Sequence, residues 1–227
     1  MAPDLPGVLT QVLEIVWIDV ILSGDNAIVI GLACRNLPER QRRLGIALGT
    51  GAAMLLRLLL TAVIIEVLQL PFVRLVGGLL LIWIAIKLAL QQQSEKNMSL
   101  AESVFAVIRI IVIADAVMSL DNMLAIAAAA KGSILLVLFG LALSVPLIIF
   151  GATLLSGLFG RFPGLIWAGV ALIGYIGGEL IGAERLVAAY PLAHAAYWEV
   201  ACGTAGLLIA VGLAWPLRSH ATKREAR

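Results

Sequence analysis

The chain has 227 residues, of which 62% are hydrophobic and 13% are charged, and its formal net charge is +2. A soluble protein of this length needs a polar surface that this composition cannot supply, which excludes a soluble enzyme, a nucleic-acid-binding protein and a disordered chain. The two cysteines, Cys34 and Cys202, show neither the paired pattern of a disulfide scaffold nor the spacing of a metal site.

Seven apolar runs follow one another, each close to the ~20 residues that a transmembrane helix needs. They cover about residues 9–33, 44–67, 73–90, 104–130, 134–159, 164–181 and 196–215. No Lys or Arg occurs in residues 1–11, so the first run lacks the positive region of a cleaved signal and is predicted to be a retained span. The predicted fold class is an all-α polytopic membrane protein, with one transmembrane domain over residues 1–215 and a basic cytoplasmic tail over 216–227.

Basic residues are distributed unevenly between the two sides that these spans define. Eleven lie on one side: Arg35, Arg40, Arg42, Arg43, Lys96, Arg109, Arg161, Arg218, Lys223, Arg224 and Arg227. Three lie on the other: Arg74, Lys131 and Arg185. Because cytoplasmic loops carry the excess of Lys and Arg, we expect the N-terminus outside and the C-terminus in the cytoplasm, which requires an odd number of spans.

The pattern Asp-x-x-x-Ser-x-Asp-Asn occurs twice, at residues 19–26 and at residues 115–122. Each copy begins a group of three spans, which we call repeat 1 (about 9–90) and repeat 2 (about 104–181); the span at 196–215 lies outside both. Because each group has an odd number of spans, the second must be inserted upside down relative to the first. Inverted repeats of this kind are typical of secondary transporters, whose binding site lies near the midplane between the repeats.

Both motif copies place acids near the middle of a span. A charge there costs at least about 2.5–3.5 kcal/mol on insertion scales, so such acids face the bundle interior and are usually functional. A set of polar clamps between the two halves is the structural alternative. The candidate site residues are Asp19, Asp25, Asn26, Asp115, Asp121 and Asn122, supported by Ser23 and Ser119.

The motif residues cannot all share one face of an unbroken helix. At about 100° per residue, Asp19, Ser23 and Asn26 fall within roughly 60° of one another, whereas Asp25 points about 120° away from Asp19. Either the helix unwinds at Ser23-Gly24, and less readily at the Ser119-Leu120 of the second copy, or the two later acids form the ion site and the two earlier ones serve another role. We expect Asp25 and Asp121 to approach each other near the midplane and bind one cation, with Asp19 and Asp115 as the proton carriers.

The donor chemistry favours a hard divalent cation. Carboxylate, amide and hydroxyl oxygens suit Mg²⁺, Ca²⁺ and Mn²⁺ rather than Cu⁺ or a zinc thiolate site. Four ionised acids would exceed the charge of one such ion, so the metal-free site is expected to hold protons that binding releases. Arg57, near the middle of the second span, can either neutralise a motif acid or pair with Glu66.

At these two motif copies the sequence resembles the TerC family, named for tellurium resistance, within the LysE-like group of membrane exporters. The resemblance covers about residues 9 to 215, and the short length is similar to that of the YjbE-type branch of metal transport proteins. It implies metal export, most often of Mn²⁺. Carried over residue by residue, it implies a polar centre formed by Asp19, Asp25, Asn26, Asp115, Asp121 and Asn122.

The leading interpretation is a divalent-cation exporter, with manganese efflux coupled to proton influx and no enzymatic activity or prosthetic group. A non-transporting membrane scaffold in stress or tellurium resistance and an exporter of an organic solute stay open. An intramembrane aspartyl protease is disfavoured because Leu22 stands where its motif needs a glycine. The expected location is the bacterial cytoplasmic (inner) membrane. The expected partners are the bilayer, the metal ion and protons, without nucleic acid, and a homo-oligomer is left open.

Overall fold

The computed structural model describes residues 5–61, 63, 70–91, 100–129, 134–184, 187 and 197–225, and this part of the chain is helical and contains no strand. Its helices are α1 (Leu5–Leu22), α2 (Gly24–Cys34), α3 (Glu39–Thr61), α5 (Val73–Leu90), α6 (Leu100–Ala129), α7 (Ile134–Arg161), α8 (Leu165–Gly182) and α10 (Trp198–Glu225). They follow the order of the predicted spans, with α1 and α2 together in the place of the first.

The described helices have the length and surface of membrane spans. Six are long and apolar enough to cross a bilayer, and a seventh crossing results if α1 and α2 are two halves of one bent span. Large apolar side chains face outward; Leu59 and Phe150, for example, are each 70% exposed. Such faces are stable against lipid and costly against water. The predicted class, an all-helical membrane protein, is therefore confirmed.

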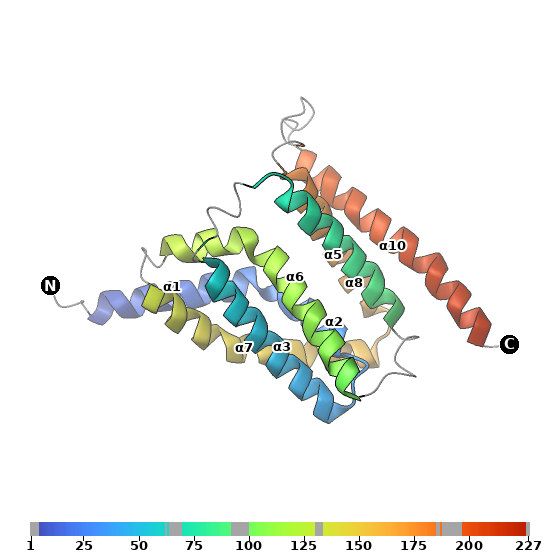
Figure 1. Cartoon of the computed structure of the whole chain (residues 1–227), viewed down its shortest axis with the longest axis horizontal. Helices are drawn as coiled ribbons and strands as arrows, with labels where there is room; N and C mark the ends of the chain where they lie inside the picture. Colours follow the sequence, from blue (N-terminus) through green and yellow to red (C-terminus); the bar gives the residue numbers. More distant parts are fainter. Residues whose placement is uncertain are drawn as a thin grey trace.

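The span that carries the first motif copy is broken at Ser23. This residue has φ −105° and ψ 8°, outside the helical region, and the two halves of the span meet at 51°. Glycine is a poor helix former and leucine a good one. Accordingly, the chain breaks beside Gly24, whereas α6 stays helical past Leu120, although it changes direction along its length (Figure 1). The first of the two alternatives left by the sequence holds for the first copy.

The helices form two groups (Figure 1). Helices α5, α8 and α10 pack side by side, at a spacing that glycine permits: a Cβ added at Gly78 of α5 would lie 2.4 Å from the carbonyl oxygen of Gly177 in α8. Helices α1, α2, α3, α6 and α7 form the other group, which holds the first two spans of each predicted repeat. Both motif copies therefore lie in one bundle.

The C-terminal helix is longer than the sequence predicted. The last span was predicted over about 196–215, whereas α10 continues through Pro216 to Glu225, into the segment predicted to be a basic cytoplasmic tail. The Ala, Lys, Arg and Glu residues of this segment favour helix, so the charged end prolongs the last span as a helix. Figure 1 shows that α1 begins and α10 ends at opposite ends of the molecule.

Candidate functional site

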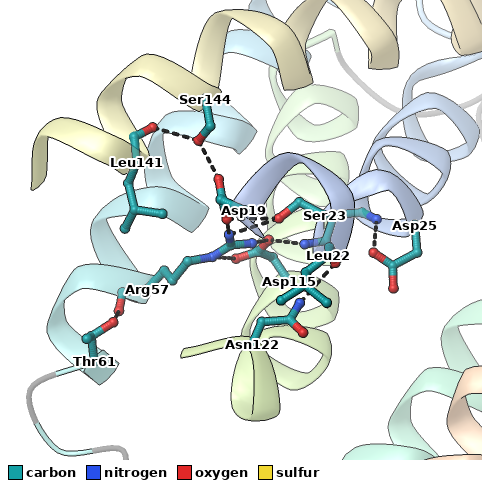
Figure 2. Close-up of polar contacts among 11 residues, drawn as sticks. Asp19, Leu22, Ser23, Asp25, Arg57, Thr61, Asp115, Asn122, Leu141 and Ser144 are labelled. Carbon is teal, nitrogen blue, oxygen red and sulfur yellow. Dashed lines mark hydrogen bonds and ion pairs between the residues drawn. The ribbon is translucent and has the colours of Figure 1, made fainter. Parts of the chain in front are cut away.

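Arg57 joins the two motif copies by pairing with one acid from each (Figure 2). It projects from α3 and is only 4% exposed. Its Nη1 pairs with Oδ1 of Asp19 in α1, its Nη2 with Oδ1 of Asp115 in α6, and its Nε lies 3.4 Å from Oδ2 of Asp115. Because an isolated buried charge is costly, the three groups stabilise one another and the cluster keeps one net negative charge.

The sequence allowed Arg57 to pair either with a motif acid or with Glu66, and in the structure it pairs with the motif acids. The competing candidate, Glu66, lies outside the described residues. Both acids of the cluster are buried, with Asp19 1% and Asp115 7% exposed.

Two hydroxyl groups complete the surroundings of Asp19. Ser23, one turn further along the same span, donates to Asp19 Oδ1 at 3.0 Å and accepts from Arg57 Nη1 at 3.0 Å. Ser144 of α7 hydrogen-bonds Asp19 Oδ2, and its Oγ lies 2.9 Å from the carbonyl oxygen of Leu141. Oxygen atoms from α1, α6 and α7 therefore converge on one point inside the bundle.

Each motif asparagine reaches across to the other motif copy. Asn26 donates from Nδ2 to Asp115 Oδ1 at 2.9 Å, and Asn122 donates from Nδ2 to the carbonyl oxygen of Leu22 at 3.0 Å. In a continuous helix the Leu22 carbonyl would accept from the Asn26 N–H. That N–H donates instead to Asp25 Oδ1 at 2.8 Å, so the break at Ser23 frees the carbonyl that Asn122 takes.

The later acids of the motif are placed differently from the earlier ones. Asp25 is half-buried, and Figure 2 shows its carboxylate turned away from Arg57. The side chain of Asp121 lies outside the described part of the structure, so the predicted approach of Asp25 and Asp121 stays a prediction. Ser119 is fully buried, one turn after Asp115.

A small cavity of about 20 Å³ lies beside the charged cluster, lined by Asp19, Thr50, Arg57, Asp115 and Ser144 together with apolar side chains. A volume of this size is enough for about one water molecule. The Oδ1 atom of Asn26 and the hydroxyl of Thr50 are buried and have no hydrogen-bond partner among the residues that the structure describes. Within the described residues, no three His, Cys, Asp or Glu side chains gather into a metal cluster. A cation held at this point would rely on two acids and neutral oxygens.

Sequence reasoning did not single out Ser144 or Thr50. Each is a hydroxyl residue within a long apolar helix, and that is the only signal the sequence holds for them. The signal is weak because Thr153 and Ser156 share it, and the Thr153 hydroxyl donates to the carbonyl of Ile149 in its own helix rather than to the charged cluster.

Comparison with known proteins agrees with this architecture. A family model described as "Integral membrane protein TerC family" matches residues 5–223. The chain is 40% identical over 186 residues to the uncharacterized membrane protein YjbE of Bacillus subtilis (strain 168), which covers 82% of this chain and 85% of YjbE. It is also 28% identical over 74 residues to the uncharacterized membrane protein YceF of the same organism, covering 33% of this chain and 29% of YceF. No solved structure matches the chain.

Proposed function

Because the chain belongs to the TerC family of integral membrane proteins, we propose that it exports a divalent metal cation from the cytoplasm, with Mn²⁺ as the expected cargo and protons as the counter-ion. Proteins of this family are commonly linked to metal transport or tellurium resistance. The observation that carries the proposal is the meeting of Asp19 and Asp115, one from each motif copy, at a buried point surrounded by oxygen atoms.

The donor set supports a hard cation as cargo. Carboxylate oxygens of Asp19 and Asp115, the unpartnered Oδ1 of Asn26 and the hydroxyls of Ser23 and Ser144 are all oxygen ligands, which suit Mn²⁺ and Ca²⁺. The sequence predicted that Asp25 and Asp121 bind the ion together; we propose instead that the centre of the transport site is the Asp19–Asp115 pair, because Arg57 brings these two acids to one point. Asp25 and Asp121 with Asn122 would bind the ion as it enters or leaves this centre.

The arrangement of the helices supports alternating access between two inverted repeats. Helix α3 packs on α6, and the broken α1–α2 span packs on α7, so the first span of each repeat meets the second span of the other. The third spans, α5 and α8, meet each other. Exchanging the two repeats leaves this pattern unchanged, as a pseudo-two-fold axis requires. With the basic side inside, the chain would span the bacterial cytoplasmic membrane with its N-terminus outside.

The size of the cavity argues against an organic cargo. Sites for small organic molecules are typically about 300–1,000 Å³, whereas the space beside Asp19 and Asp115 is about 20 Å³. No feature of the described residues specifically favours the scaffold role.

The test is metal uptake into proteoliposomes across a panel of divalent ions, with Cu⁺ as the soft comparison ion. Mn²⁺ should be transported, and Asp19→Asn and Asp115→Asn should each abolish the flux. The matched control is Glu199→Gln, the same acid-to-amide change at an exposed position of α10. Transport of Cu⁺ equal to that of Mn²⁺, or normal Mn²⁺ flux in both aspartate variants, would overturn the proposal.

A further inference from the structure

We infer that the Arg57 guanidinium is a tethered substitute for the transported cation, which neutralises Asp19 and Asp115 when the metal has left and must withdraw before the metal binds. This inference rests on the proposed function and gives Arg57 a distinct part in it. Metal and guanidinium would alternate at one pair of carboxylates, and this alternation would allow the carrier to return without cargo.

The contacts of Arg57 make its position incompatible with a bound metal ion. Its Nη1 and Nη2 pair with Oδ1 of Asp19 and Oδ1 of Asp115, one carboxylate oxygen from each motif copy. A divalent ion held between these acids would lie about 2.0–2.6 Å from the same oxygens. The guanidinium N–H groups already occupy that space, so the two cations exclude each other.

The described structure indicates the direction in which the guanidinium would withdraw. Side chains on a helix lean toward its N-terminus, and Thr50 lies two turns before Arg57 on the same face of α3. Both residues line the cavity of about 20 Å³, and within the described part of the chain the buried hydroxyl of Thr50 has no hydrogen-bond partner. The cavity takes only about one water molecule, so the withdrawal requires α3 to shift relative to α1 and α6. The Thr50 hydroxyl would then offer the guanidinium an acceptor, and the two carboxylates would be left to the metal.

The charge of the site explains why such a substitute is needed. With neither metal nor arginine present, the two buried carboxylates would depend on protons alone for positive charge, and any acid left ionised would be strongly disfavoured. Arg57 replaces one of the two positive charges that the departing ion removes, and the protons taken up in exchange supply the rest. The carrier can then change its orientation with either the metal or Arg57 paired with the acids. Ionised acids without a partner would raise the free-energy cost of this change.

The distinguishing measurement compares two modes of transport in proteoliposomes. Net efflux of Mn²⁺ into metal-free medium requires the carrier to return without cargo. Exchange of radioactive Mn²⁺ against equal Mn²⁺ on both sides does not. Arg57→Gln should keep exchange and reduce the ratio of net efflux to exchange by at least about tenfold, because the return step then exposes uncompensated buried acids. It should also lower the Mn²⁺ concentration that half-saturates exchange, because the competing cation is gone.

Two further variants make the result interpretable. Arg109→Gln, the same change at an exposed position of α6, should keep the wild-type ratio. Arg57→Lys keeps the charge but cannot bridge both acids, so its ratio should lie between those of the wild type and Arg57→Gln. This variant decides the matter if the glutamine protein does not purify as a single species.

The inference is overturned if a well-folded Arg57 variant has the wild-type ratio, or if both modes fall equally, which would indicate a purely structural role. Absence of Mn²⁺ flux in either mode in the wild-type protein would instead refute the proposed function, and the inference would fall with it.

Discussion

Asn26 of the first motif copy donates a hydrogen bond from Nδ2 to Oδ1 of Asp115 in the second copy, at 2.9 Å and across 89 residues of sequence. The same Asp115 oxygen pairs with Arg57, whose other nitrogen pairs with Asp19. The two copies of the motif are therefore parts of one polar cluster. A substitution in either copy should therefore alter the contacts of the other copy.

The Asn26–Asp115 hydrogen bond gives the first prediction. Asn26→Ala should lower the free energy of unfolding by about 1–3 kcal/mol, because buried Asp115 loses a donor. Mn²⁺ transport should also fall. The melting temperature in detergent and the flux in proteoliposomes check the two effects. Asn36→Ala, in the turn between α2 and α3, is the control and should change neither. A melting temperature equal to that of the wild type for Asn26→Ala would contradict the importance of the cross-repeat contact.

Asp25 and Asp121 give the second prediction, which concerns the later acid of each motif copy. Asp25→Asn and Asp121→Asn should each abolish export. Membrane insertion should stay intact, because replacing an acid removes insertion cost. Growth of expressing cells in manganese checks export, and the amount of protein in isolated membranes checks insertion. Normal manganese tolerance with either variant would contradict the prediction that both acids bind the transported ion.

The third prediction concerns orientation in the membrane. The basic residues place the C-terminus in the cytoplasm, and the break between the fourth and fifth spans outside. A reporter that is active only in the cytoplasm should therefore be active when fused after Arg227 and silent when fused after Lys131. The opposite pattern would mean that the inverted-repeat assignment is wrong.

The fourth prediction concerns coupling to protons. Buried acids that exchange a divalent ion must take up positive charge when it leaves, and a metal ligand has to be deprotonated to bind. An inward proton gradient should therefore accelerate outward Mn²⁺ flux, and a reversed gradient should reverse it. The measurement is Mn²⁺ flux in proteoliposomes with internal and external pH set independently. If the gradient has no effect and added Mn²⁺ releases no protons, a channel-like or sodium-coupled route is the better account.

The sequence alone determined the class of this protein and indicated the two motif copies as its candidate site. Hydrophobic runs are local, and they predicted the order of the described helices because a bilayer forces each run to satisfy its own backbone hydrogen bonds. The repeated motif identified acids in two spans. A charged side chain inside an apolar run is costly in lipid, so its presence there indicates a function. The break at Ser23 was left as one of two alternatives, because one glycine shifts local helix stability by only about 1 kcal/mol.

Tertiary structure decided which of these groups meet. Arg57 lies 38 residues from Asp19 and 58 from Asp115, and Ser144 lies 125 residues from Asp19. No local pattern encodes such contacts, which depend on how α3, α6 and α7 rotate and pack around the broken first span. Packing turned Arg57 toward the motif acids, brought Thr50 to the cavity and left Asp25 facing away. The sequence could name the acids, but only the packed bundle paired two of them through one arginine, because burying a charge requires a partner that the fold alone can supply.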